Sequence, residues 1–301
     1  MKTIDVSIII VSFNTRNLTL DSIRSIEKTV KKSTYEIIVV DNNSSDGSVE
    51  EIEELCKDIP ELTLIKNKEN VGFSRANNIG IKKSHGRYVL FLNSDTIVYE
   101  KTIDGMVTFM DENPDCGAST CFLRMPSGAL DDASHRGFPT PWRAFSHFSG
   151  LSKIFSKSKL FSGYSMTYVD ITKTHEIDAL AGAFMLVASS AGEEIGWWDE
   201  DYFFYGEDLD FSYRLKQRGW KIYFMPDYEI LHYKGASGGI KNQSKGITTA
   251  DKKTKMKAQE ERFRAMKLFY NKNYKNKYPK VVRNMVFWGI GIKKLISSIR
   301  S

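Results

Sequence analysis

The 301-residue sequence has few cysteines and no long apolar run. No stretch approaches the ~20 apolar residues of a membrane-spanning helix. The N-terminus runs from Met1 directly into a strand-like segment, without the charged-then-apolar leader of a secreted protein. The three cysteines (Cys56, Cys116 and Cys121) are an odd number without metal-binding spacing, so we expect reduced core thiols. Together these absences favour a cytoplasmic protein.

Positive charge is concentrated at the C-terminal end of the chain. Residues 241–301 hold 17 Lys/Arg and 3 Asp/Glu, a net charge of +14, whereas residues 1–240 have a net charge of −8. An acidic body with a basic tail indicates that the tail meets an anionic surface, either phospholipid headgroups or nucleic acid. A solvated tail without a partner is the alternative.

Strand-like apolar runs alternate with amphipathic segments over the first 125 residues. We expect strands over residues 6–11, 36–40, 62–65, 88–92 and 118–122. We expect helices between them over 18–30, from the turn at 41–47 to about 56, over 74–84 and over 103–110. This alternation predicts an α/β fold, a Rossmann-like and mostly parallel central sheet with helices on both faces. Ligands bind such sheets at the carboxyl ends of the strands.

The second half of the chain is less regular. Residues 124–175 are rich in Gly, Ser, Pro and aromatics, which predicts a lid or a partner-binding insertion. Later segments predict a helix over 208–218, a strand over 221–225, and tail helices over 258–270 and 281–299. We therefore divide the chain into a domain at 1–240 and a basic helical extension at 241–301.

Two polar segments fit the binding of a nucleotide. Six polar residues, from Asp41 to Asp46, follow the expected strand over 36–40, more than a helix cap needs. Asp41 could accept the ring N–H of a pyrimidine or bond a ribose hydroxyl, although an ordinary Asx turn is the alternative. In the second segment, Gly72 permits a close backbone approach, and Arg75 or the helix start at Ser74 could face a phosphate. A glycine turn before an amphipathic helix is the alternative there.

Acidic residues form two further candidate sites. Asn93 and Asp95 end a strand and offer the oxygen ligands that Mg²⁺ or Mn²⁺ prefers, although Asn-x-Asp also makes turns. His232 follows another strand and is either a third ligand or a satisfied core histidine. Glu207 and Asp208 begin a helix after an aromatic run, which would desolvate a carboxylate and raise its pKa toward that of a general base. The helix dipole also favours acids there.

A third acid in that helix has a structural interpretation. Asp210 is four residues before Arg214, and this i,i+4 pair braces the helix.

Together these motifs resemble the inverting glycosyltransferases of family 2, which have the GT-A fold. The match runs from Ser7 to about Gly238 and comprises, in family order, residues 6–14, 41–47, 70–78, 93–95, 182–183, 196–199, 207–208 and 232. Within the family, the segments at 136–141, 203–210 and 265–270 are most similar to rhamnosyltransferases of cell-surface polysaccharide synthesis.

The resemblance implies a role for each site residue. A divalent metal, Mg²⁺ or Mn²⁺, would be bound by Asp95, His232 and Asn93, with Asn93 replacing the first acid of the family's D-x-D. Asp208 would be the catalytic base, and Glu207 would shape the acceptor side. The nucleotide-sugar would be bound by Ser12, Asn14, Asp41, Asn43, Gly72, Arg75, Asn93, Ser94 and Asp95. The sugar and acceptor pocket would be bordered by Gly182, Ala183, Trp198 and Phe204. Within the domain at 1–240, the resemblance implies a nucleotide-binding half at about 1–123 and an acceptor half at about 124–240.

The implied reaction moves one sugar, L-rhamnose from dTDP-L-rhamnose, to a glycan or a polyprenyl-diphosphate-linked acceptor. A UDP-sugar donor is the alternative. Residues 217–220 read Gln-Arg-Gly-Trp, which is not the Gln-x-x-Arg-Trp signature of processive synthases, so we expect one sugar per encounter. A nucleotidyltransferase would need a Gly-rich pyrophosphate loop near the N-terminus, which is absent. A non-catalytic sugar- or nucleic-acid-binding module would not need both acidic sites, and the tail has too few aromatics to stack bases, so we expect no nucleic-acid partner.

The tail segment at 281–300 mixes large apolar residues with Arg283, Lys293, Lys294 and Arg300. This composition suits a helix that lies in the headgroup region of an anionic membrane without spanning it. It predicts a peripheral protein at the inner face of the plasma membrane. A helix that docks on its own domain or on a homodimer partner is the alternative.

Overall fold

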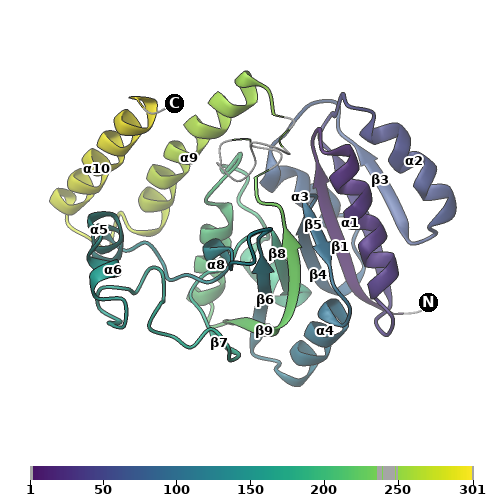
Figure 1. Cartoon of the computed structure of the whole chain (residues 1–301), viewed down its shortest axis with the longest axis horizontal. Helices are drawn as coiled ribbons and strands as arrows, with labels where there is room; N and C mark the ends of the chain where they lie inside the picture. Colours follow the sequence, from purple (N-terminus) through teal and green to yellow (C-terminus); the bar gives the residue numbers. More distant parts are fainter. Residues whose placement is uncertain (1–2, 236–238, 240–247, 249, 300–301) are drawn as a thin grey trace.

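The chain folds around a nine-stranded mixed sheet with helices on both faces (Figure 1). The computed structural model describes residues 3–235, 239, 248 and 250–299. The strands are ordered β3-β2-β1-β4-β8-β6-β9-β5, and β7 pairs with β9 outside this path. The α/β architecture expected from the sequence is confirmed.

The N-terminal half is a regular alternation of strands and helices. Its elements are β1 (Ile4–Ser12), α1 (Arg16–Thr29), β2 (Tyr35–Asp41), α2 (Ser48–Asp58), β3 (Leu62–Lys66), α3 (Phe73–Ile81) and β4 (Gly86–Asn93). Strand β1 pairs in parallel with β2 and β4, and β2 pairs in parallel with β3. The carboxyl ends of these four strands therefore meet at one edge of the sheet, where ligands bind in open α/β sheets.

The second half introduces antiparallel strands. Its elements are β5 (Thr96–Val98), α4 (Thr102–Glu112), β6 (Cys116–Arg124), the 3₁₀ turn η1 (Asp132–Ser134), α5 (Pro141–Ser149), α6 (Leu151–Ile154), β7 (His175–Glu176), β8 (Phe184–Ala188), α7 (Ser189–Ile195), α8 (Glu207–Gln217) and β9 (Lys221–His232). Strand β8 is antiparallel to both β4 and β6, and β5 is antiparallel to β9. The expected parallel pairing holds for β1–β4 and for β6 with β9.

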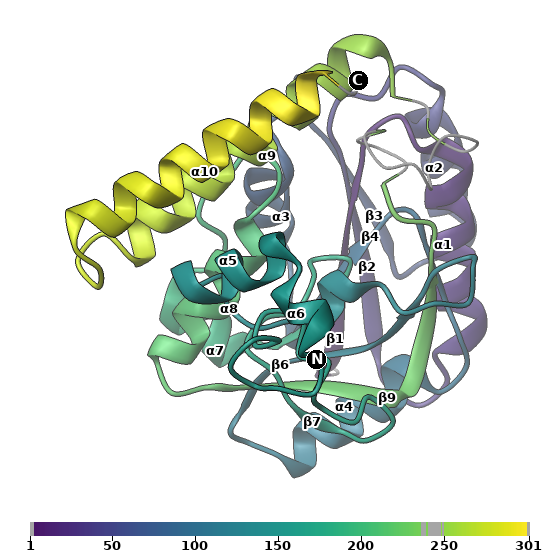
Figure 2. The same cartoon turned by 60° about the vertical axis from the view of Figure 1, so that its left-hand side comes forward.

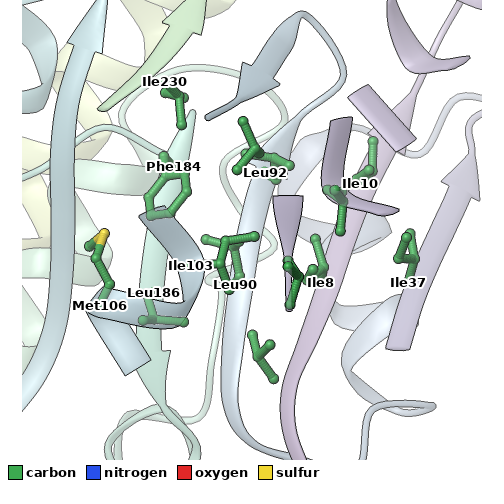
Figure 3. Close-up of a cluster of buried hydrophobic side chains, with 14 of the residues drawn as sticks. Ile8, Ile10, Ile37, Leu90, Leu92, Ile103, Met106, Phe184, Leu186 and Ile230 are labelled. Carbon is green, nitrogen blue, oxygen red and sulfur yellow. The ribbon is translucent and has the colours of Figure 1, made fainter. Parts of the chain in front are cut away.

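Both faces of the sheet are buried, which explains why β1 and β4 are continuous apolar runs. On one face, alternate residues of β1, β4 and β8, such as Ile8, Leu90 and Phe184, pack against Ile103 and Met106 of α4 (Figure 3). The intervening residues point to the other face, where α3, α7 and α8 cover them. The central strands are thereby fixed in register, and their ends can hold functional groups in place.

The C-terminal residues form two helices, α9 (Lys252–Asn273) and α10 (Lys280–Ile299), which lie side by side at one end of the molecule (Figures 1 and 2). An aromatic cluster that includes Tyr213 of α8 and Phe269 and Tyr274 near the end of α9 joins α9 to the sheet domain. Among the described residues, no helix is long and apolar enough to cross a membrane. The predicted boundary at residue 240 lies outside the described residues.

Candidate active site

Strand β2 ends in Asp41, a buried carboxylate of which one oxygen accepts a hydrogen bond within the protein. Its Oδ1 accepts the backbone N–H of Ser44 at 2.8 Å. Its Oδ2 is buried and has no hydrogen-bond partner among the described residues. Because a buried polar atom without a partner is costly, this oxygen is suited to accept an N–H or O–H from a ligand.

The turn after Asp41 is held by the end of β1. Asn14 has a positive φ of 53°, its N–H donates to Ser44 Oγ at 2.9 Å, and its Oδ1 accepts the N–H of Ser45 at 2.8 Å. Asn43, within the turn, also has a positive φ of 67°. The buried Ser12 Oγ lies 3.2 Å from Thr19 Oγ1, so its side chain braces β1 against α1. Asn14 thus shapes the turn over residues 41–47, hereafter the Asp41 turn. Ser12 supports this turn from inside the domain.

Gly72 joins the Asp41 turn to the segment before α8. Its φ is +88°, and its carbonyl accepts the Nδ2–H of Asn42 at 3.2 Å. A Cβ at Gly72 would lie 2.6 Å from the carbonyl oxygen of Phe203, to which the N–H of Phe73 donates at 2.8 Å. Only glycine permits this close approach. Arg75 instead lies on the surface, with its Nε 3.9 Å from Glu200.

The end of β4 brings the acidic segment beside β8 and β9. The N–H of Asn93 donates to the carbonyl of Ala183 at 3.0 Å, and Ser94 Oγ accepts the hydroxyl of Thr15 at 3.0 Å. Thr96 pairs with His232 in the antiparallel register of β5 and β9. This register explains why Asp95, the preceding residue, meets a histidine far away in the sequence.

Asp95 and His232 form a buried pair. The Oδ1 of Asp95 lies 3.4 Å from Nε2 of His232, and its Oδ2 accepts the N–H of Gly235 at 3.0 Å. On the other side of the ring, His232 Nδ1 lies 3.0 Å from Oδ2 of Asp131, and the Oδ1 of Asp131 accepts a hydrogen bond from Lys234. Burial disfavours the charged imidazole, but the Asp95 and Asp131 carboxylates outweigh it and raise the pKa of His232 to about 9.

These residues fit a divalent cation. His232 Nε2 is buried beside a carboxylate oxygen and makes no well-formed hydrogen bond. Asp131 at Nδ1 gives the carboxylate–histidine arrangement that orients metal-binding imidazoles. Among the described residues, no group of three or more His, Cys, Asp or Glu is arranged as a complete metal site. A cation held by Asp95 and His232, with Asn93 at the strand end, would therefore draw further oxygens from a diphosphate.

Two adjacent carboxylates begin α8. Glu207 is buried, and its Oε2 has no hydrogen-bond partner among the described residues. Burial, reinforced by the neighbouring Asp208, raises the pKa of Glu207 to about 8. Burial, together with the charges of Glu207 and Asp95, also raises the pKa of Tyr205, although Arg262 opposes this. The charges of both acidic sites therefore act on the Tyr205 hydroxyl.

Asp208 is paired with an arginine from the insertion. Arg136 Nη2 lies 2.6 Å from Asp208 Oδ2, and the two side chains are only 12% and 16% exposed. The same Nη2 donates to the carbonyl of Leu180 at 3.3 Å, and the backbone of Arg136 bridges to Ala179. Sequence reasoning missed Arg136, Asp131 and Lys234 as site residues, because contacts across more than 70 residues leave no local spacing to detect.

The predicted acceptor pocket is divided between the site and the core. The position of a Cβ on Gly182 lies 3.4 Å from the ring of Phe73, and Ala183 is hydrogen-bonded to the end of β4. Phe204 packs on Tyr205 with ring centroids 4.2 Å apart. Trp198 is only 2% exposed and packs among Phe91 and Phe211, so its ring supports the site from beneath without lining an open surface.

The family described as glycosyl transferase family 2 matches residues 7–170. The chain belongs to this family. The matched segment contains the Asp41 turn, the Asp95 segment and Arg136. Membership in this family confirms the prediction that the protein is an enzyme, a glycosyltransferase.

Curated relatives of this family 2 glycosyltransferase include rhamnosyltransferases. It is 29% identical over 207 residues to the rhamnosyltransferase WbbL of Escherichia coli K12, covering 66% of this chain and 73% of that protein. It is 26% identical over 214 residues to the N-acetylglucosaminyl-diphospho-decaprenol L-rhamnosyltransferase of Mycobacterium tuberculosis H37Rv, covering 67% and 68%. These relatives confirm the predicted similarity to rhamnosyltransferases of cell-surface synthesis.

Solved structures confirm the GT-A fold. The crystal structure of GalNAc-T7 with UDP, GalNAc and Mn²⁺ matches with a TM-score of 0.63 at 15% identity, covering 96% of this chain and 56% of that one. The mannosyltransferase PcManGT of Pyrobaculum calidifontis, in complex with GDP-Man and Mn²⁺, matches with a TM-score of 0.60 at 15% identity, covering 100% and 76%. At this identity the likeness shows the fold alone.

Proposed function

We propose that this glycosyltransferase moves L-rhamnose from dTDP-L-rhamnose to a lipid-linked glycan, one sugar per encounter, with inversion and a divalent cation. The main observation is a set of three acidic sites: the open oxygen of Asp41, the Asp95–His232 pair, and Glu207 with Asp208. Strand β1 pairs with both β2 and β4, which places Asp41 and Asn93 at one edge of the sheet, and the contact of Gly72 with Phe203 joins this edge to the segment before α8. The names of two relatives support rhamnose as the sugar.

The base of the nucleotide donor binds at the Asp41 turn. Asp41 Oδ2 accepts the ring N–H of the pyrimidine, while Oδ1 remains bonded to the N–H of Ser44. Asn14 keeps the turn in shape through its two hydrogen bonds to Ser44 and Ser45. Thymine and uracil present the same ring N–H, so Asp41 does not separate dTDP from UDP donors. The fold match to a protein solved with UDP keeps the UDP-sugar as a second candidate.

The diphosphate end of the donor meets the buried Asp95–His232 pair. Asp95, His232 and Asn93 would hold the cation, which when bound neutralises charge on the departing diphosphate. Asp131 accepts the Nδ1–H of His232 and so directs Nε2 toward Asp95. Lys234 compensates the charge of Asp131, whose pKa is held well below its usual range despite burial, because His232 and Lys234 are close.

The attacking hydroxyl loses its proton to Asp208. Arg136 fixes the orientation of this carboxylate through its Oδ2. As the acceptor oxygen bonds to the anomeric carbon, the bond from that carbon to the nucleotide's phosphate oxygen breaks on the opposite face, which inverts the configuration. Glu207, with its pKa of about 8, is largely protonated at neutral pH and can donate a hydrogen bond to the acceptor side.

Product stereochemistry and one isosteric variant test this mechanism. Proton NMR of the first transfer product should show the anomeric configuration opposite to that of the donor. Asp208→Asn should lose about 100-fold or more in kcat, whereas Asp201→Asn, a surface carboxylate paired with Lys272, should keep full activity. A retained configuration, or full transfer by Asp208→Asn, would contradict an inverting displacement with Asp208 as base.

We also propose that the enzyme works peripherally at the inner face of the plasma membrane, with residues 281–300 contacting anionic lipid. The lipid-linked substrate in the name of the mycobacterial relative supports this location.

A further inference from the structure

Large apolar side chains are exposed mainly in two segments of this molecule. Among the described residues, fourteen large hydrophobic side chains are exposed; six lie between residues 142 and 160 and six on α10. The two segments touch, because the ammonium of Lys293 on α10 lies 3.5 Å from the ring centroid of Phe148 on α5. Both cartoons show α5 next to α10, and in Figure 1 these helices and α6 lie at the left, opposite α2 (Figures 1 and 2).

Helix α10 has two apolar faces, and packing explains only one. Its inner face contacts α9 through the buried Ile290 and through Phe287, whose ring centroid lies 5.9 Å from that of Tyr270. The exposed residues Val281, Met285, Trp288, Ile292 and Leu295 recur at the spacing of one helix face. Trp288 is 73% exposed. The docking of α10 on its own domain, an alternative left open by the sequence, therefore leaves a second apolar stripe.

Both segments also lack negative charge. Residues 133–169 contain five Lys/Arg and no Asp or Glu, and residues 262–301 contain eleven Lys/Arg and no Asp or Glu. Apolar side chains among lysines and arginines, without acids, match an interface between anionic headgroups and acyl chains. Two copies of these two segments in a symmetric dimer would meet without an acid to pair with their lysines and arginines, and dimer interfaces are depleted in lysine.

We propose that the exposed apolar side chains of residues 142–160 and of α10 form one lipid-docking surface for anionic bilayers. We name it the α5–α10 surface. It extends the contact proposed for residues 281–300 by a second segment, the insertion after β6. Each apolar side chain that enters the interface contributes favourable transfer free energy, and the basic residues add attraction to anionic lipid.

The α5–α10 surface is connected directly to the active site. Residues 137–140 alone separate Arg136, which holds Asp208, from Pro141 at the start of α5. A bilayer at this surface would therefore hold a lipid-linked acceptor on the side from which Asp208 takes its proton. This last step rests on the proposed function, whereas lipid docking itself does not.

Flotation with vesicles tests the surface, using the full chain. The wild type should float with vesicles of phosphatidylglycerol and phosphatidylcholine and much less with phosphatidylcholine alone. Met285→Ser/Trp288→Ser on α10 and Phe145→Ser/Ile154→Ser on α5–α6 should each weaken partitioning about tenfold or more, since a tenfold change corresponds to less free energy than two buried large side chains contribute. Met256→Ser is the matched control, because Met256 is 57% exposed but lies on α9.

Several outcomes would overturn the proposal. Flotation that is absent, equal on both vesicle types, or unchanged in the two double variants would do so. Loss in the α10 variant alone would remove the second segment from the surface. A concentration-dependent dimer that these variants abolish, without flotation, would assign the surface to a second copy. Hydrolysis of free donor without vesicles, measured in parallel, keeps this test separate from that of the proposed function.

Discussion

The ion pair between Arg136 and Asp208 gives the sharpest single perturbation. Arg136→Met removes the guanidinium 2.6 Å from Asp208 Oδ2 and leaves a carboxylate that is only 16% exposed without its counter-charge. Truncating one partner of a buried pair costs about 3–5 kcal/mol. Partial exposure puts this pair at the lower end, about 3 kcal/mol, which would lower Tm by roughly 6–12 °C. Thermal unfolding measures that part of the effect.

The catalytic part of the effect should be larger than the loss of stability implies. A base that leaves its productive geometry by about 1 Å can lose about 100-fold in rate. We therefore expect kcat to fall about 100-fold in Arg136→Met at a temperature where the variant is folded, with the KM for donor little changed. Arg136→Lys, which keeps the charge, should recover part of the rate.

A second arginine of the same insertion provides the control. Arg143 Nη1 lies 2.6 Å from Asp178 Oδ2, the same separation as in the Arg136 pair, but it does not contact Asp208. Arg143→Met should lower Tm and leave kcat within about twofold at a temperature where it is folded. If Arg136→Met and Arg143→Met affect kcat equally, or if folded Arg136→Met keeps wild-type kcat, Arg136 does not position the base.

Three further predictions concern Gly72, Asp41 and Glu207. Gly72→Ala should be less stable than Gly128→Ala in chemical denaturation: both glycines have φ above +80°, but only at Gly72 would the new Cβ meet a carbonyl oxygen, that of Phe203, at 2.6 Å. The backbone of Gly72, with φ 88° and ψ 175°, is essentially confined to glycine and costs the alanine variant about 1–3 kcal/mol, and the clash adds about 1–3 kcal/mol to Gly72→Ala alone. Asp41→Asn should weaken binding of dTDP about tenfold in calorimetry, because a charge-assisted hydrogen bond contributes about 1.5–3 kcal/mol. Glu207, whose pKa is raised from 4.5 to about 8, contributes stability that is fully present below pH 4.5 and is lost as pH rises through about 8. The Tm of the wild type should therefore fall relative to that of Glu207→Gln across this range.

Each of these predictions has a contrary result. Equal losses of stability in the two glycine variants would mean that the Phe203 contact imposes no constraint. Unchanged affinity for dTDP in Asp41→Asn would remove Asp41 from the nucleotide site. Parallel Tm profiles for the wild type and Glu207→Gln would mean that Glu207 has an ordinary pKa in the folded protein.

Apolar spacing in the sequence predicted the strands and helices of the N-terminal half, because each of these elements buries one face or both faces regularly. The strands that became β1–β4 and the helices between them follow from apolar runs and turn residues, because both kinds of signal lie within a few residues. The pairing of Asp210 with Arg214 was also predicted, and their contact of 2.6 Å confirms it. The antiparallel entry of β8 between β4 and β6 depends on distant pairing and leaves no such signal.

The candidate site was predictable where its residues end strands or begin a helix. Asp41, Asp95 and His232 stand at or beside strand ends, and the strand pairing places Asp41 and Asn93 at one edge and brings Asp95 to His232, whereas Glu207 begins α8. Arg136 reaches Asp208 from an insertion without periodicity, and its contribution could not be read from spacing. The insertion itself was expected to be irregular, but it contains α5 and α6, which are nine and four residues long and therefore too short for a periodicity signal to be decisive.

Nucleotide release from a panel of dTDP-, UDP- and GDP-sugars is the most direct measurement of the central claim. It would be made with Mg²⁺, Mn²⁺ or EDTA, for the wild type and Asp95→Ala. We predict turnover of dTDP-L-rhamnose by the wild type that EDTA and Asp95→Ala both abolish. Full turnover in EDTA would contradict the role given to Asp95 and His232, turnover of a UDP-sugar alone would replace rhamnose as the donor sugar, and failure to bind any nucleotide would contradict the proposed reaction as a whole.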